Sequence, residues 1–197
     1  MTLPTGLRSS TIFILIFSIY AISNLSFGHA QTETWMRYND PRQKFTFLHP
    51  PDWNVNSTHN DNGYTEVVLV NPNSGRMKAT IMFIPNDPLL VSKTGKPILP
   101  SRALTNFEEE ISSGGDYFSF NSTGQFPHKY TIQGLESASD IIDYEKIQGR
   151  PGKMLIVYAK IGDKDSIVFS YGDSKRTFYK TLSNASQIIK SLSLLNR

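Results

Sequence analysis

The chain has 197 residues, of which 39% are hydrophobic and 19% are charged, and its formal net charge is +3. These values are typical of a folded protein of one domain, and so balanced a charge argues against a nucleic-acid-binding protein. Cysteine is absent, which excludes disulfide bonds, thiolate metal sites and a cysteine nucleophile.

The N-terminal segment, residues 1–30, has the layout of a secretory signal. Arg8 is its one charged residue, residues 12–22 (IFILIFSIYAI) are apolar, and residues 28–30 (GHA) offer the small residues that a signal peptidase recognises. We therefore expect an exported protein, either secreted or held in an extracytoplasmic compartment.

An uncleaved membrane anchor is the alternative for this segment. Its apolar region, residues 11–27, approaches the lower limit of about 17 residues for spanning a bilayer. An anchor of this kind would keep the exported domain at a membrane surface.

The next segments predict an entry arm and the first strand of a single domain, residues 44–197. Residues 31–43 are mostly polar and predict an arm whose aromatic side chains dock on the domain. In KFTFLHPPDWNV (44–55), the aromatic run predicts a strand, the two prolines end it, and Trp53 re-enters the core. Residues 56–63 (NSTHNDNG) predict a polar loop.

A hairpin and a helix are predicted next. Residues 64–70 and 78–84 alternate as paired strands do, and the second segment is apolar on both faces, which predicts a central strand. After a proline-rich crossing, residues 85–100, Ser101 is predicted to cap a helix that ends at Gly114.

The second half predicts strands and a last helix. Residues 116–134 predict one or two short strands. The segments 137–147, 154–161 and 166–171 predict an antiparallel meander. A helix capped by Asp173 or Ser174 follows and runs to about residue 191. Its apolar stripe consists of Phe178, Leu182, Ala185, Ile189 and Leu192, and the tail 193–195 predicts a short edge segment.

Together these elements predict an α+β fold, an antiparallel β-sheet flanked by helices in an α/β/α sandwich. The segments FTFLHPPDW, YEKIQGRPGKMLIVYA, SIVFSYG and IIKSL resemble PsbP-like domains, in order, over residues 38–195. That family is similar to the Mog-type Ran-binding fold. It takes its name from extrinsic, lumenal subunits of photosystem II that are associated with calcium and chloride retention.

The resemblance implies a non-catalytic role in binding or assembly, and we expect a non-photosynthetic prokaryotic secreted member. It transfers no functional residue, because the family has no short catalytic motif. Calcium as a cofactor, and a calcium-binding extrinsic membrane protein as an alternative function, are implied by the resemblance alone.

The absence of known catalytic motifs from the sequence favours a protein that is not an enzyme. The sequence has no G-x-S-x-G elbow, glycine-rich phosphate loop or H-E-x-x-H motif, and His49, His59 and His128 lack the spacing of metal ligands. His49 is predicted to be a structural hydrogen-bonding residue. A secreted small-molecule carrier or a hydrolase-type enzyme, with a pocket between sheet and helices, is the alternative.

Four further groups of residues are candidates for sites. Asp163 and Asp165 share a tight turn and are weak candidates for a calcium site, although turn composition favours a plain hairpin. The run Glu108–Glu110 predicts a solvated helix face rather than a cation site. Five crowded aromatic residues are candidates for contacting a protein partner or an envelope complex: Tyr117, Phe118, Phe120, Phe126 and Tyr130. Asn56, Asn121 and Asn184 lie in glycosylation sequons.

Overall fold

The computed structural model describes residues 34–74, 76–92, 94–114, 117–123, 130–146 and 150–195, three of them (Tyr117, Phe118 and Arg150) by their backbone only. The expected signal, residues 1–30, lies outside the described residues. The helices and strands are β1 (Met36–Asn39), β2 (Phe45–His49), β3 (Asn54–His59), β4 (Thr65–Val70), β5 (Lys78–Ile84), the 3-10 helix η1 (Pro88–Leu90), α2 (Pro100–Ser113), β6 (Tyr117–Ser122), β7 (Glu136–Lys146), β8 (Arg150–Ile161), β9 (Asp165–Ser174), α3 (Phe178–Ser191) and β10 (Ser193–Leu194).

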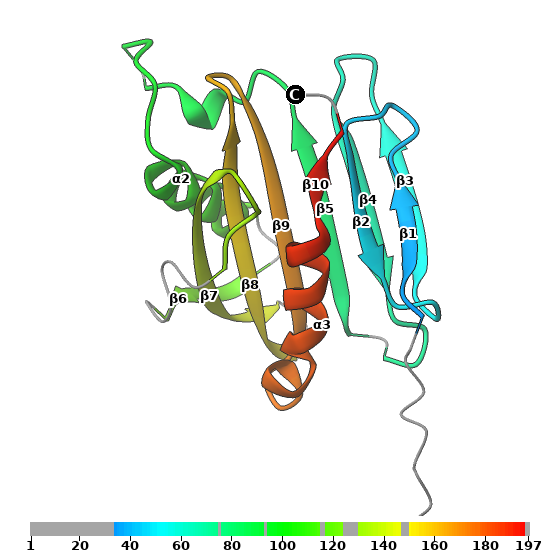
Figure 1. Cartoon of the computed structure of the whole chain (residues 1–197). Coiled ribbons are helices and arrows are strands. Elements are labelled where there is room, and N and C mark those ends of the chain that lie inside the picture. Colours follow the sequence, from blue (N-terminus) through cyan, green and yellow to red (C-terminus); the bar gives the residue numbers. More distant parts are fainter. Residues whose placement is uncertain are drawn as a thin grey trace, which may run out of the picture. The chain divides into compact units, whose positions relative to one another are not determined.

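The strands of the described part of the chain form two antiparallel sheets. The larger sheet has the order β3-β4-β5-β9-β8-β7-β6, and the smaller one has the order β1-β2-β10. In Figure 1, α2 lies on one face of the larger sheet, and α3 lies on the other face. The α+β class and the flanking helices are confirmed, but the prediction of one sheet is wrong, because β2 pairs with β1 and β10 in a sheet of its own.

The predicted hairpin and meander are confirmed. β4 pairs with β5, and β7, β8 and β9 pair in sequence. β5 also pairs with β9, so it is the central strand that its two apolar faces predicted. Its Ile81 is buried in the cluster on the α3 side, and its Met82 packs against the cluster on the α2 side.

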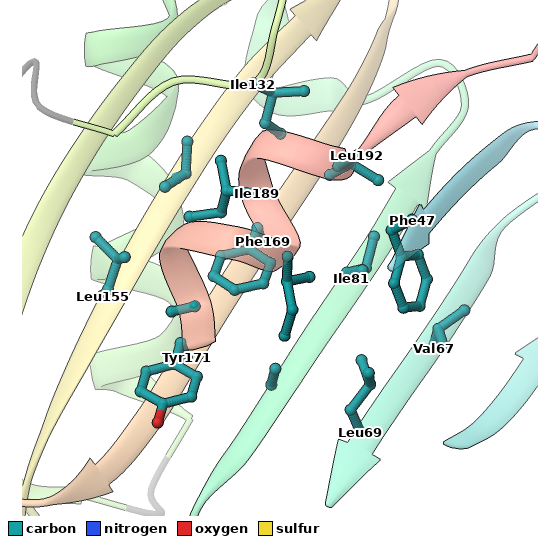
Figure 2. Close-up of a cluster of buried hydrophobic side chains, with 14 of the residues drawn as sticks. Phe47, Val67, Leu69, Ile81, Ile132, Leu155, Phe169, Tyr171, Ile189 and Leu192 are labelled. Atoms are coloured by element: carbon teal, nitrogen blue, oxygen red, sulfur yellow. The ribbon is translucent and has the colours of Figure 1, made fainter. Parts of the chain in front are cut away.

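The main hydrophobic cluster lies between the larger sheet, α3 and the smaller sheet. Figure 2 shows Ile189 of α3 beside Phe169 of β9, with Ile81 of β5, Phe47 of β2 and Leu192, the residue that follows α3, completing the group. The predicted stripe of α3 is confirmed, since Phe178, Ala185, Ile189 and Leu192 are buried and Leu182 packs against them. Burial of this stripe is the main reason that α3 forms where it does.

Trp53 is buried as predicted. Its side chain is 4% exposed, and its ring stacks on Tyr171 of β9 with centroids 6.4 Å apart. The proline corner thus directs the tryptophan into the main cluster. His49 is also buried, and its Nδ1 lies 2.8 Å from the carbonyl oxygen of Pro50, in agreement with the predicted structural role.

A second, smaller cluster lies beneath α2. It combines Leu90 and Leu104 with Ile142, Ile156 and Tyr158 of the sheet. Both clusters belong to one compact unit, Thr34–Arg197. Because this unit contains its own core, it has what a domain needs to fold by itself.

Two segments differ from the prediction in secondary structure. The expected arm contains β1, where Tyr38 stacks on Phe47 with centroids 4.9 Å apart. The first half of the expected polar loop, residues 56–59, belongs to β3, an edge strand whose residues are mostly exposed. Polar residues suit this strand because only its partner β4 requires hydrogen bonds from it, and its outer side faces solvent.

Both helix caps also differ from the prediction. α2 begins at Pro100 with Leu99 as N-cap, because proline suits the first helical position, so Ser101 lies inside the helix. β9 extends through Ser174, and α3 starts after Thr177. Gly114 ends α2 as expected. Within the described residues, neither helix is long and apolar enough to cross a bilayer.

Candidate functional site

The two aspartates of the β8–β9 turn do not converge. The Asp163 side chain is 84% exposed, with its Oδ1 3.3 Å from Lys160 Nζ, whereas Asp165 Oδ1 accepts a 2.9 Å hydrogen bond from the backbone N–H of Asn86. Among the residues that the structure describes, no group of three acidic or histidine side chains is arranged to hold a metal. Asp163 therefore pairs with a lysine beside the turn, and Asp165 holds the backbone of Asn86, the segment next to the turn.

The five aromatic candidates do not form one described surface. Phe120 packs against the α2-side cluster, whereas Tyr130 packs against the main cluster on the opposite face of the sheet. Tyr117 and Phe118 belong to β6, and their side chains lie outside the described residues, as does Phe126. His128 lies outside them too.

The sequons occupy three different positions. Asn56 is exposed on the edge strand β3, and Asn121 is exposed on β6. Asn184 lies within α3 and is half-buried. Asn56 and Asn121 are therefore more accessible to a glycan than Asn184 is. Glycosylation of the three asparagines stays a prediction.

His59 belongs to a polar link between the two sheets. Its Nδ1 lies 3.1 Å from Thr65 Oγ1 and 3.8 Å from Oδ1 of the buried Asp40. The other oxygen of Asp40 accepts a 3.0 Å hydrogen bond from the backbone N–H of Lys44. Because His59 Nε2 is buried, a substrate cannot reach it in this structure, and the group serves to join β3 to the turn before β2.

Glu108 corrects the prediction of a fully solvated acidic face on α2. It is half-buried, and among the described residues its buried Oε1 has no hydrogen-bond partner. Burial and the nearby Asp140 raise the pKa of Glu108 to about 7. This carboxyl group is therefore sensitive to pH near neutrality. Glu109 and Glu110 are exposed, as predicted.

A basic and aromatic surface lies where α3 begins, and it is the best candidate for binding. We call it the α3-start surface and define it by four exposed side chains: Lys175, Arg176, Tyr179 and Lys180. Tyr179 is 52% exposed, and the Lys175 side chain is 60% exposed. The first turn of α3 contains no acidic residue.

Buried groups hold this surface in place. Lys153 and Asp143 face each other across β8 and β7, and their Nζ and Oδ1 atoms are 2.6 Å apart. Lys153 Nζ lies 5.5 Å from the ring centroid of Tyr179, and Lys175 Nζ lies 3.5 Å from Asp143 Oδ2. The Tyr179 ring also packs edge-on against the buried ring of Phe178 at 5.3 Å. The aromatic ring is thus fixed from two sides.

Electrostatics keep these groups charged. Burial opposes the charged form of Lys153, but the ion pair with Asp143 and the contact with Tyr179 outweigh it and raise the pKa of Lys153. Burial likewise opposes ionisation of Asp143, but the two lysines outweigh it and lower the pKa of Asp143. The single carboxylate of Asp143 is therefore paired with the ammonium groups of Lys153 and Lys175, and these three side chains together keep a net positive charge.

The other acids on this face leave the balance positive. Asp173 is buried, and its Oδ2 accepts a 2.9 Å hydrogen bond from Thr181 Oγ1. Glu145 is partly buried two residues beyond Asp143 and on the same side of β7. The α3-start surface sets three exposed cations, Lys175, Arg176 and Lys180, against this one carboxylate.

Sequence reasoning missed this surface. Of the two predicted partner-binding residues whose side chains the structure describes, Tyr130 interacts electrostatically with Tyr179 of this surface, and burial together with this neighbour raises the pKa of Tyr130. The signal available in the sequence was the cluster of Lys175, Arg176 and Lys180 around a helix start, with a tyrosine among them. The cross-strand pair beneath it required the register of β7 and β8.

No protein-family model matches the sequence, and no curated protein matches it either. Solved structures do. The fold is similar to the Ran-binding protein Mog1p of Saccharomyces cerevisiae, with a TM-score of 0.54 and 8% identity, over 83% of this chain and 97% of that one. It is also similar to cyanobacterial PsbP (CyanoP) from Synechocystis sp. PCC 6803, with a TM-score of 0.52 and 12% identity, over 86% of this chain and 97% of that one.

A third similar structure is LpqN of Mycobacterium tuberculosis, described as involved in cell envelope biogenesis. Its TM-score is 0.52 at 13% identity, and the match covers 82% of this chain and 90% of that one. At such low identity, these likenesses concern the fold. The chain has the Mog1/PsbP-like fold that the sequence resemblance implied.

Proposed function

We propose that the protein is an exported, non-catalytic binding domain that docks an acidic segment of a protein partner at its α3-start surface, within an envelope-associated complex. The observation that carries this proposal is the set of exposed cations and the exposed, fixed Tyr179 above the Lys153–Asp143 pair. Export is inferred from the layout of residues 1–30.

The chemistry of this surface suits carboxylates. Lysine and arginine side chains form charge-assisted hydrogen bonds with acidic groups, and tyrosine is enriched in the contact surfaces of proteins. Because Asp143 and Lys153 hold the neighbouring Lys175 and Tyr179 in place before binding, less conformational entropy is lost when a partner docks.

The use of the other polar groups supports a binding role over catalysis. His59 links two sheets, and Asp173 binds Thr181 at the start of α3. In this structure, both groups are engaged with the fold. Two fold relatives point in the same direction, since Mog1p is described as Ran-binding and LpqN as acting in cell envelope biogenesis.

Affinity capture from a native envelope extract tests the proposal. The Thr34–Arg197 unit is compared with the double variant Lys175→Glu/Arg176→Glu and with Lys164→Glu, which reverses an exposed charge in the β8–β9 turn. We expect a specific partner in the wild-type and Lys164→Glu captures and its loss from the double variant. Recovery of no specific partner, or equal recovery by the double variant, would contradict the proposal.

A further inference from the structure

The crossing between β5 and α2 contains a hairpin that extends away from the helices and sheets (Figure 1). It spans residues 91–99, and Val91 and Pro97 form an antiparallel bridge between its arms. Val91 is 40% exposed, and Leu99 is 64% exposed. Large apolar side chains left in water on a projecting segment indicate a contact with another apolar phase or surface.

Four described backbone N–H groups of the hairpin are paired within it or with its base. The N–H groups of Ser92 and Gly95 donate to the carbonyl oxygens of Lys96 and Ser92, both at 2.8 Å. The N–H of Lys96 donates to Ser92 Oγ at 3.0 Å, and that of Ile98 donates to the carbonyl oxygen of Leu90 at 2.9 Å. Such internal pairing lowers the cost of moving a loop into a medium poor in water.

A buried polar network fixes the base of the hairpin. Asp87 is 1% exposed, and its Oδ2 accepts hydrogen bonds from the hydroxyls of Tyr158 and Ser166. Its Oδ1 accepts a 2.9 Å hydrogen bond from the backbone N–H of Leu89 at the start of η1. The next residue, Leu90, is fully buried. The hairpin is therefore presented from a rigid platform while Val91, Lys96 and Leu99 remain exposed.

The charge of this part of the sequence is wholly positive. Between Asp87 and Glu108 the chain carries Lys93, Lys96 and Arg102 and no acidic residue. Lys96 is exposed within the hairpin. Basic side chains beside exposed apolar ones complement a surface that is negatively charged outside and apolar beneath.

We propose that the 91–99 hairpin docks the protein on the surface of an anionic lipid bilayer, with Val91 and Leu99 entering the headgroup region and Lys96 contacting lipid phosphates. Basic side chains beside the exposed Val91 and Leu99 favour a lipid surface, which is charged outside and apolar beneath, over a protein partner. This contact is separate from the α3-start surface and does not rest on the partner proposed for it.

Co-sedimentation of the Thr34–Arg197 unit with lipid vesicles tests this inference. The probes are vesicles of phosphatidylcholine alone and vesicles of phosphatidylcholine mixed with phosphatidylglycerol. We expect binding to the mixed vesicles that weakens as salt is added, and little binding to phosphatidylcholine alone. Lys96→Ala is expected to weaken binding about fivefold and Leu99→Ser about tenfold or more.

Matched variants separate the hairpin from general surface effects. Leu195→Ser removes an exposed leucine (43%), and Lys190→Ala removes an exposed lysine, both outside the hairpin. Neither is expected to change vesicle binding, and the hairpin variants should keep the wild-type Tm because both side chains are exposed. Lys175→Glu/Arg176→Glu serves as the variant of the α3-start surface and is expected to bind vesicles as the wild type does.

Three results would overturn the inference. One is the absence of binding to the mixed vesicles, and another is equal binding to phosphatidylcholine alone. The third is a loss of binding that follows the control variants or the α3-start variant as strongly as the hairpin variants. If the hairpin variants lower partner capture while the unit ignores vesicles, the hairpin is a protein contact and the lipid assignment is wrong.

Discussion

The carboxylate of Asp87 offers a sharp test of how the β5–α2 crossing is held. Asp87→Ala leaves the hydroxyls of Tyr158 and Ser166 and the backbone N–H of Leu89 without the acceptor that they share. A buried polar group without a partner costs about 1–3 kcal/mol, so the two buried hydroxyls alone amount to about 2–6 kcal/mol, which is a large part of the stability of an ordinary domain.

The same geometry predicts that Tyr158→Phe lowers the free energy of unfolding by a smaller amount. This variant removes one donor to a charged acceptor, worth about 1.5–3 kcal/mol, while Ser166 and Leu89 keep Asp87 occupied. Burial and the adjacent Asp87 raise the pKa of Tyr158, so its hydroxyl remains a donor at ordinary pH. The double variant should lose less than the sum of the two single losses, because both remove the same hydrogen bond.

Urea unfolding of the Thr34–Arg197 unit measures these free energies, with unchanged m-values showing that the unfolding transition is the same. Ser183→Ala, at an exposed position on α3, serves as a control for loss of a surface hydroxyl. A loss below about 1 kcal/mol for Asp87→Ala, or strict additivity with Tyr158→Phe, would refute the shared buried network.

Three further predictions concern the sheet and its ionisable groups. A Cβ at Gly152 would lie 2.4 Å from the Tyr144 ring, so Gly152→Ala should lower the free energy of unfolding by about 1–3 kcal/mol, with partial recovery in Gly152→Ala/Tyr144→Ala by urea titration. The pKa of Glu108 is raised from 4.5 to about 7, so between these pH values the folded protein holds a proton that the unfolded chain has lost. Stability should therefore fall as pH rises from about 4.5 to about 7. Glu108→Gln should remove that fall in a profile of Tm against pH. Asp143→Asn should cost about 1–3 kcal/mol in thermal unfolding because it leaves the buried Lys153 without its ion-pair partner, and an unchanged Tm would contradict that pairing.

Local patterns in the sequence were enough to predict most of the larger sheet. The alternation in β4 and β5 and the apolar run of β8 reflect burial on one or both faces, which a sequence records directly. The smaller sheet could not be predicted in this way. Its strands pair residues as distant as Phe45 and Leu194, and such pairing depends on which edges meet after folding.

The candidate site was harder to predict than the fold for the same physical reason. Lys153 and Asp143 become neighbours only through the register of β7 and β8, and α3 then brings Tyr179 over them. A shift of one residue in that register would turn both charged side chains to the opposite face. Phe120 and Tyr130, the two of the predicted aromatic residues whose side chains the structure describes, lie on opposite faces of the sheet, since they pack against different clusters.

Site-specific photo-crosslinking in the native cell tests the central claim most directly. A benzophenone amino acid replaces Tyr179, whose ring is 52% exposed on the α3-start surface, and in a matched strain it replaces exposed Lys164. We expect one defined cross-linked product from position 179 that disappears with Lys175→Glu/Arg176→Glu and is absent from position 164. No product from position 179, or the same products from both positions, would contradict a partner-binding role for this surface.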